Sequence, residues 1–201
     1  MVRCPRHRVD PVSLGSEGRA ARETIDGVDY SRPFLLAALL AGLAPACSPA
    51  LDWRDARVEG GLTALFPCKP TALARDAALH GQRVRMTLWS CTAGGAGYSV
   101  THADVRTPDA VAPALAEMRS ALAANVGAAA ASGVPLRVPG MTPGPQALRL
   151  RLRGRLPDGA TVEEHAVFFA RGTHVYQAVV LGAHPGGDAV ETFFGALKLP
   201  A

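Results

Sequence analysis

Lysine is almost missing from this chain of 201 residues: it occurs only at Lys69 and Lys198, so nearly every basic side chain is an arginine. Aromatic residues are also scarce, at 5%, and charged residues make up 19%, below the share of about a quarter that is usual in globular proteins. The net charge is only +4, and acidic and basic residues are mixed along the chain. A concentrated basic face is therefore not expected, and no nucleic acid is expected as a partner.

Long apolar runs are absent as well. The most apolar stretch, residues 34–46, has thirteen residues, whereas a membrane-spanning helix needs about 20. It has the length of the apolar core of a secretory signal and ends in Ala44-Pro45-Ala46, an A-x-A cleavage pattern. We therefore predict an export signal over residues 34–46. The alternative, a buried apolar helix, is disfavoured by Pro33, Gly42 and Pro45.

Cys47 follows this cleavage pattern directly, and the segment resembles the lipobox of bacterial lipoproteins. The resemblance implies a lipid anchor on Cys47 that attaches the protein to a membrane, and Ser48 implies sorting to the periplasmic face of the outer membrane. Leu43 lies one place further from the cysteine than the leucine of the family, and Pro45 is atypical. A soluble periplasmic product of ordinary signal peptidase is therefore the alternative.

Residues 1–33 show neither a helical nor a strand period and are predicted to be disordered. The next methionine after Met1 is Met86, so an alternative GTG start codon at Val28 would leave residues 1–27 untranslated. Residues 47–59 are expected to form a tether, and residues 60–201 a single globular domain.

The cysteines of the mature chain predict one disulfide. If Cys47 carries a lipid and Cys4 is removed with the leader, Cys68 and Cys91 remain to pair in an oxidising compartment. Strands expected over residues 73–79 and 83–90, with a turn at residues 80–82, form a hairpin that brings these two cysteines close together. The alternative, a catalytic Cys68 with His80 or His102, needs a reduced thiol and is disfavoured.

The alternation of polar and apolar residues predicts an α+β fold, an antiparallel sheet covered by two helices. Further strands are expected over residues 61–66, 98–104, 148–153, 161–170 and 174–181. Thr107-Pro108-Asp109 predicts the start of a helix, and a second, short helix is expected over residues 189–196. The expected inner face of the first helix carries Val111, Leu115, Met118 and Leu122.

Three segments, LFPCKP, HVYQAVVLG and TFFGALKL, resemble the PsbP-like fold family, which the Mog-type Ran-binding factors share. Phe66, Pro67 and Pro70 match the opening of the family pattern. Phe193, Phe194, Leu197 and Leu199 match its close, where Gly195-Ala196 departs from the pattern. The resemblance covers residues 60–200 and implies an α/β/α sandwich that acts as an accessory or binding module. It carries over no ligand residues.

Arg149, Arg151, Arg153 and Arg155 follow one another at every second position. On a strand such side chains share one face, about 7 Å apart. They form a possible contact for an anionic headgroup or an acidic partner. The alternative is a solvated face, with Glu163 or Glu164 answering across the hairpin in weak surface pairs.

Histidine and cysteine spacings fit no metal site, and the glycine-rich stretch CTAGGAG lacks the Lys-Ser/Thr of a phosphate loop. No catalytic residue, metal or cofactor is expected. The preferred hypothesis is a non-enzymatic lipoprotein that binds another envelope component. The alternative is a periplasmic small-ligand carrier or enzyme with a pocket between sheet and helix, and a concave pocket with convergent polar groups would favour the carrier.

Overall fold

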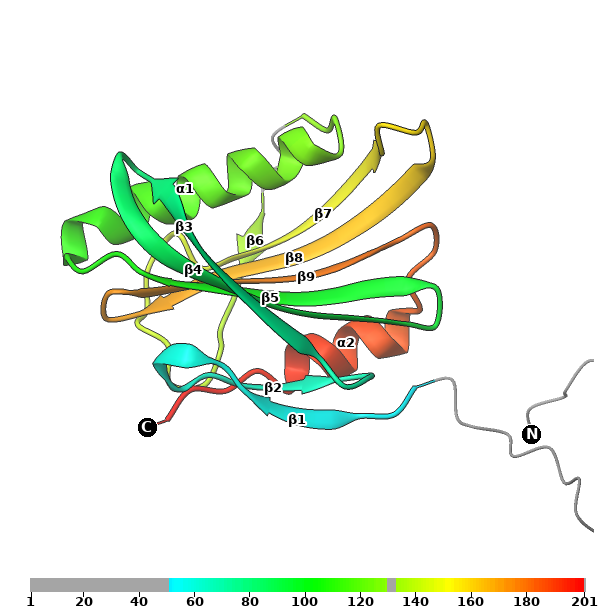
Figure 1. The fold of residues 1–201 in the computed structure, drawn as a ribbon, viewed down its shortest axis with the longest axis horizontal. Coiled ribbons are helices and arrows are strands. Elements are labelled where there is room, and N and C mark those ends of the chain that lie inside the picture. The colour runs from blue at the N-terminus through cyan, green and yellow to red at the C-terminus, as the bar shows by residue number, and fades with distance from the viewer. Residues whose placement is uncertain (1–50, 130–132, 201) are drawn as a thin grey trace, which may run out of the picture. The chain divides into compact units, whose positions relative to one another are not determined.

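The computed structural model describes residues 51–129 and 133–200, which form two antiparallel sheets and two α-helices (Figure 1). The predicted leader, the export signal and Cys47 lie outside the described residues. Among the described helices, none is both long enough and apolar enough to cross a membrane.

The larger sheet has seven strands in the order β3-β4-β5-β9-β8-β7-β6, and every neighbouring pair is antiparallel. Its strands are β3 (Thr71–Leu79), β4 (Gln82–Ala93), β5 (Ala96–Asp104), β6 (Val134–Pro135), β7 (Leu148–Arg155), β8 (Thr161–Arg171) and β9 (His174–Gly182). Tight turns join most of them, and His80 and Gly81 both have positive φ in the turn between β3 and β4. The strands predicted in this sheet are confirmed, apart from short extensions and the two-residue edge strand β6, which was not predicted. The strand predicted over residues 61–66 begins only at Thr63 and belongs to a second sheet.

A second, two-stranded sheet was not anticipated from the sequence. In it β1 (Arg54–Arg57) pairs with β2 (Thr63–Phe66), and the 3-10 turn η1 (Glu59–Gly61) joins them. The structure thus includes part of the expected tether in the folded body. The segment Arg54–Arg57 carries no apolar alternation, because only Ala56 points inward. Pairing with β2, rather than local sequence pattern, makes this segment a strand.

Two helices cover opposite faces of the large sheet (Figure 1). Helix α1 (Pro108–Asn125) begins at the predicted proline, although the Thr107 side chain makes no capping hydrogen bond. Leu115, Met118 and Leu122 of α1 are buried as expected, and they share a core with Leu150 and Leu152 of β7. Helix α2 (Gly187–Gly195) packs with β1 and β2 on the other face.

The core under α2 is aromatic. Phe193 meets the rings of Phe66 and Tyr98 edge-on, each at a centroid distance of 5.3 Å. All three side chains are almost completely buried, and burying a side chain of this size stabilises the fold by roughly 2–3 kcal/mol. This core therefore fixes the C-terminal helix and the small sheet against β5.

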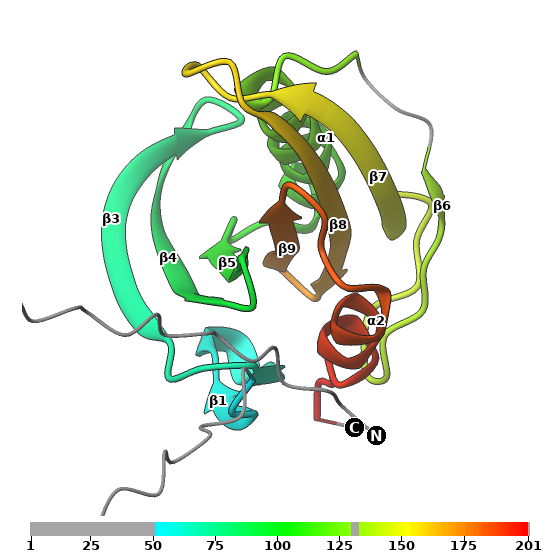
Figure 2. The same cartoon turned by 90° about the vertical axis from the view of Figure 1, so that its right-hand side faces the viewer.

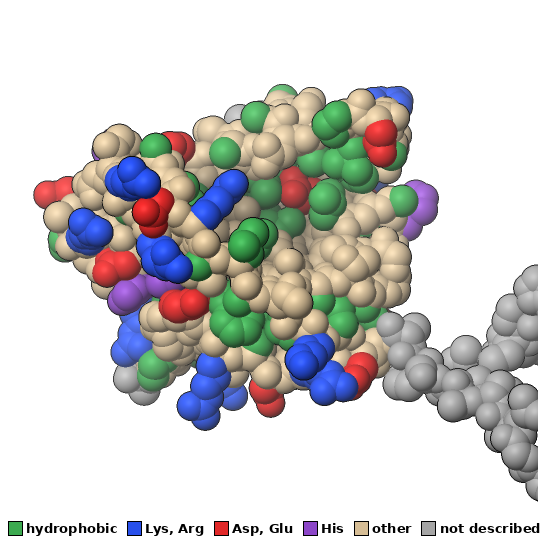
Figure 3. Space-filling model, viewed as in Figure 1, with side chains coloured by type: hydrophobic (Ala, Val, Ile, Leu, Met, Phe, Trp, Pro, Cys, Tyr) green, Lys and Arg blue, Asp and Glu red, His purple; other side chains and the backbone are tan. Residues whose placement is uncertain are grey.

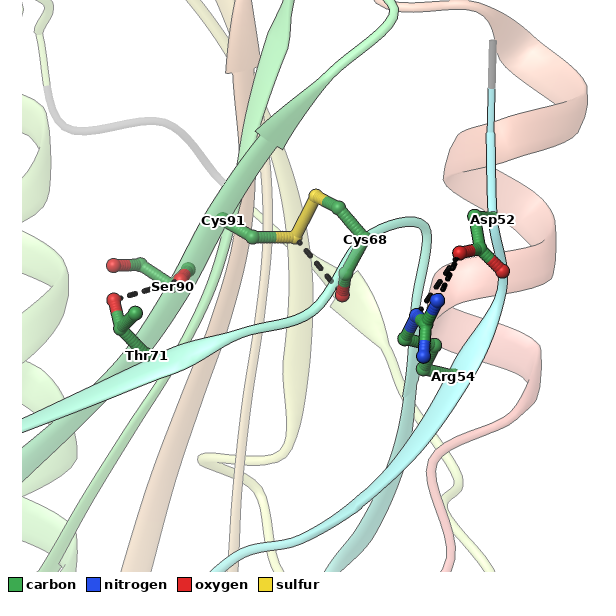
Figure 4. The surroundings of a disulfide bond; sticks show 6 residues. All are labelled: Asp52, Arg54, Cys68, Thr71, Ser90 and Cys91. Atoms are coloured by element: carbon green, nitrogen blue, oxygen red, sulfur yellow. Dashed lines mark hydrogen bonds and ion pairs between the residues drawn. A yellow bond between two sulfur atoms is a disulfide. The ribbon is translucent and has the colours of Figure 1, made fainter. Parts of the chain in front are cut away.

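The hairpin β3–β4 bows away from α1, and we call it the arch (Figure 2). Its tip returns to the helix: Leu79 and Val84 are buried in the α1 core, and the backbone N–H of His80 donates to the Glu117 carboxylate at 2.6 Å. Its base is held by the predicted disulfide between Cys68 and Cys91 (Figure 4). The arch is therefore fixed at both ends and free of α1 between them.

Candidate functional site

The four arginines of β7 lie where the sequence placed them, on the face of the sheet opposite α1. Arg149 is half-buried, whereas Arg151, Arg153 and Arg155 are exposed. Leu150 and Leu152, which alternate with them, are buried under the helix. The predicted alternation of the strand is confirmed.

The guanidinium groups of these arginines form ion pairs or hydrogen bonds with acidic side chains and with one backbone oxygen. Arg149 donates to both carboxylate oxygens of Glu191 on α2 and also lies over the Phe194 ring at 5.3 Å. Arg155 donates to the carbonyl oxygen of Gly159 at 3.2 Å. The two middle arginines share Glu163 across the hairpin.

Glu163 is the centre of this charged cluster. It accepts a hydrogen bond from Arg151 at 2.8 Å, faces Arg153 at 3.5 Å, and lies 2.6 Å from Nε2 of His165. The hydrogen bond from Arg151, helped by His165, lowers the pKa of Glu163 to about 2. Three of the four arginines thus share two carboxylates, and Arg155 bonds to a neutral carbonyl oxygen, so most of the positive charge on this face is already paired. This arrangement corresponds to the solvated, paired alternative considered for the arginine row.

The other face of the sheet carries a groove bounded by the arch, α1 and the strands between them. It consists of two adjoining hollows with volumes of about 410 Å³ and 270 Å³. Both hollows are lined by Leu88, Thr101, Leu122 and Gln177. We call this feature the α1 groove. Figure 3 shows that this face is hollowed beside the helix and that hydrophobic side chains gather there.

The walls of the α1 groove are largely apolar. Met86 and Leu88 come from the arch, and Met118 and Leu122 come from α1. Leu73 is 65% exposed and Leu88 is 37% exposed, which makes them two of the most exposed large hydrophobic residues of the described chain. The groove therefore leaves apolar surface uncovered on both walls, and its size is within the range of small-molecule sites.

One acidic residue, Glu164 of β8, lines the smaller hollow. It lies on the inward face of β8 together with Val162 and Ala166, and only 3% of its surface is exposed. Its Oε2 atom is buried without a hydrogen-bond partner among the described residues. Burial raises the pKa of Glu164 to about 7. A buried carboxyl without a partner is costly for a fold, so it is the most pointed chemical feature of the groove.

Glu164 was not predicted as a site residue, because the sequence prediction treated both Glu163 and Glu164 as surface acids. The two residues point to opposite faces of β8, since side chains alternate along a strand. The segment TVEEHAVFFA contained the necessary signal. Val162, Ala166, Phe168 and Ala170 define an apolar face on which Glu164 is the single carboxylate.

A histidine pair lies at the other end of the aromatic core. Nε2 of His102 and Nδ1 of His174 are 3.0 Å apart, and the Tyr176 hydroxyl donates to the carbonyl oxygen of Glu59 at 3.3 Å. Burial, and secondarily His174, lowers the pKa of His102 to about 4. Residues 51–129 and 133–200 contain no group of three or more potential metal ligands. The two imidazole rings stack with their centroids 5.2 Å apart.

A smaller pocket of about 220 Å³ lies between the start of α1 and the loop that precedes β7. Pro108, Leu115 and Pro145 are among its lining residues, and no charged side chain lines it. It offers little for recognition compared with the α1 groove.

Comparison with protein-family models and with curated proteins finds no match to this chain.

Proposed function

We propose that this protein is a non-enzymatic ligand-binding module of the cell envelope, which carries a small amphipathic molecule in the α1 groove. One observation supports this proposal above the others: an apolar groove of ligand size contains a buried carboxyl group without a partner. This is the concave pocket with polar groups that favours a carrier. The resemblance to PsbP-like binding modules points the same way.

The arginine face supports a docking function less well. An anionic headgroup or an acidic partner would have to compete with Glu163 and Glu191 for the guanidinium groups. Exposed ion pairs of this kind contribute little to stability and can exchange partners. With three of the four arginines already paired to a carboxylate, the face offers an incoming anion less free positive charge than the arginine row alone suggests.

Export with a lipid on Cys47 completes the proposal. The disulfide between Cys68 and Cys91 supports an oxidising compartment. The Leu51 side chain lies beside Gly94, in the turn between β4 and β5, and Glu164 is level with Thr92, near the same turn. Four residues span at most about 14 Å, so a lipid at position 47 would hold this end of the groove close to the membrane.

The anchor is tested by labelling cells with radioactive palmitate. We expect the label in the wild-type protein and none after Cys47→Ala. Unlabelled wild-type protein, released in soluble form from the periplasm, would contradict the anchor and leave the soluble alternative.

Ligand binding is tested with the full chain carrying Cys47→Ser, purified without detergent and titrated with the neutral apolar dye Nile red. We expect saturable binding at one site. Ala121 lies on the exposed rim of the groove, so Ala121→Trp should fill the groove and weaken binding at least tenfold.

The matched control is Ala124→Trp, which adds the same side chain at an exposed position of α1 that does not line the groove. Binding should be unchanged. Absence of saturable binding, or equal binding by both tryptophan variants, would refute the proposed function.

A further inference from the structure

We infer that the ligand of the α1 groove is a cationic amphiphile, an apolar body ending in a protonated amine, with the Glu164 carboxylate as its counter-ion. The inference rests on the proposed function and names the class of ligand. It follows from the charges and polar groups that surround the two ends of the groove.

The Glu164 end of the groove has no positive charge of its own among the described residues. Burial alone accounts for the raised pKa of Glu164, and no charged side chain contributes to the shift. Neighbouring positions on the adjacent strands are Leu152 on β7 and Leu181 on β9. A ligand ammonium group would supply the missing partner, and charge-assisted hydrogen bonds of this kind are strong in a sheltered site.

Helix α1 reinforces the preference for a cation. The carbonyl oxygen of Val126, just after the helix, accepts a hydrogen bond from the backbone N–H of Arg155 at 2.8 Å. Gly154, beside Arg155, pairs with Val162, two residues before Glu164, so the C-terminal end of the helix lies at the Glu164 end of the sheet. A helix C-terminus carries partial negative charge, and the last turn of α1 contains no basic residue. The carboxylate and the helix end therefore act in the same direction, against an anion and in favour of a cation.

The basic side chain that lines the groove, Arg75, is too far away to neutralise Glu164. In the register of the sheet, Arg75 of β3 is level with Ala170 of β8. Glu164 is six residues from Ala170 on the same strand, a distance of about 20 Å along the strand direction. The two charges thus mark opposite ends of the groove.

The surface between these ends fits an apolar body. Met86, Leu88 and Met118 form the walls. Ser99, Thr101 and Gln177, which line the floor, are neutral. The arrangement places the apolar part of the ligand along the arch and its charged head at Glu164.

The inference is tested at pH 8 with three ligands of equal chain length: decylamine, decanol and decanoate. Each is used to displace Nile red from the Cys47→Ser protein, below the critical micelle concentration of the two charged ligands and below the solubility limit of decanol. We expect decylamine to bind at least tenfold more tightly than decanol, and decanoate to bind most weakly. Glu164→Gln should remove the advantage of the amine and leave decanol binding unchanged.

Glu163→Gln is the matched control, because Glu163 is the adjacent carboxylate on the opposite face. This variant should keep the full preference for the amine. If decanol or decanoate binds as tightly as decylamine, or if the preference survives Glu164→Gln, the inference is overturned while the groove remains a binding site. If the wild-type groove takes up neither dye nor any of the three ligands, the proposed function fails and the inference fails with it.

Discussion

Glu164 and Glu163 are adjacent in sequence and opposite in behaviour. Burial among apolar groups raises the pKa of Glu164 to about 7, whereas Arg151 and His165 lower the pKa of Glu163 to about 2. The first residue therefore weakens the fold when it ionises, and the second stabilises the fold when ionised. A residue that weakens the folded state and lines a groove is typical of a binding site.

We expect Glu164→Gln to change how stability depends on pH. The unfolded carboxyl ionises near its ordinary pKa of 4.5, whereas the folded one keeps its proton until about pH 7. Wild-type stability should therefore fall relative to the variant as pH rises from 4.5 to 7, by about 3 kcal/mol in total. Urea unfolding of both proteins at pH 4, 6 and 8 measures the difference. Parallel curves would show that Glu164 is not buried as described.

Glu163→Gln should change the pH dependence of stability in the opposite direction. Its folded pKa is depressed, so the wild-type carboxylate stabilises the fold above about pH 4.5, and this contribution is lost as the pH falls toward 2. The variant should therefore be less stable than the wild type at pH 7 and approach it in acid.

For single residues, the sequence predicted the sheet face on which a side chain lies better than it predicted the side chains that surround it. The alternation in β7 placed Arg149 and Arg151 on one face, because the two-residue period needs only local information. The pairing of His102 with His174 joins residues from β5 and β9, and no local pattern reveals it. The isolation of Glu164 likewise depends on which side chains surround it in space.

Among the elements, the arch depends most on a covalent bond. Replacing both cysteines, Cys68→Ser with Cys91→Ser, opens a loop with a sequence separation of 23 residues. We expect a loss of about 3 kcal/mol in the free energy of unfolding, because the unfolded chain gains conformational entropy. Urea unfolding of the double variant and the parent measures the loss.

Cys47→Ser is the reference for this measurement, because residue 47 precedes the described body. The Cys47→Ser protein keeps the disulfide, so it should unfold at the same urea concentration as wild-type protein that carries no lipid. Equal stability of the double variant and its parent would mean that the disulfide does not constrain the chain.

Strands and helices could be predicted largely from sequence, and their curvature could not. Thr107-Pro108-Asp109 predicted the start of α1, because the fixed φ of proline suits the first turn of a helix and needs no information from distant residues. The hairpin was predicted over residues 73–90 from its turn at residues 80–82, and it supported the pairing of Cys68 with Cys91 that the cysteine count indicated. The outward bow of β3 and β4 depends on contacts at the tip and the base, which lie far apart in sequence.

The C-terminal strand-like segment ties the whole molecule together. Thr63 and Lys198 exchange backbone hydrogen bonds, and the N–H of Leu199 donates to the carbonyl oxygen of Pro139 at 2.9 Å. Leu197 is buried in the aromatic core. The first and last described segments are therefore part of one cooperative unit.

We expect Leu197→Ala to destabilise the entire fold by roughly 2–5 kcal/mol, because it creates a cavity in a packed core. Leu73→Ala removes the same atoms from a side chain that is 65% exposed, and it should change stability far less. Thermal unfolding followed by circular dichroism measures both, and a single shifted transition is expected for Leu197→Ala. Equal effects of the two substitutions would contradict the assigned core.

The whole arrangement was the least predictable part. The sequence indicated an α+β fold with two helices, and the structure confirms this. The separate two-stranded sheet was missed because Arg54–Arg57 carries almost no apolar pattern. A pocket between sheet and helix belonged to the alternative hypothesis only. Its location could not be predicted, because it depends on α1 lying over β8 and β9 and not over β3 and β4.

Because the arch is fastened at its tip through Leu79, Val84 and His80 and at its base through the disulfide, neither end is available as a hinge. If the α1 groove holds a ligand as proposed, the ligand should enter past β3, the edge strand of the sheet, without a hinge motion of the arch. We then expect the observed association rate to rise linearly with ligand concentration, without a plateau. Differences in affinity among ligands should arise mainly from their dissociation rates.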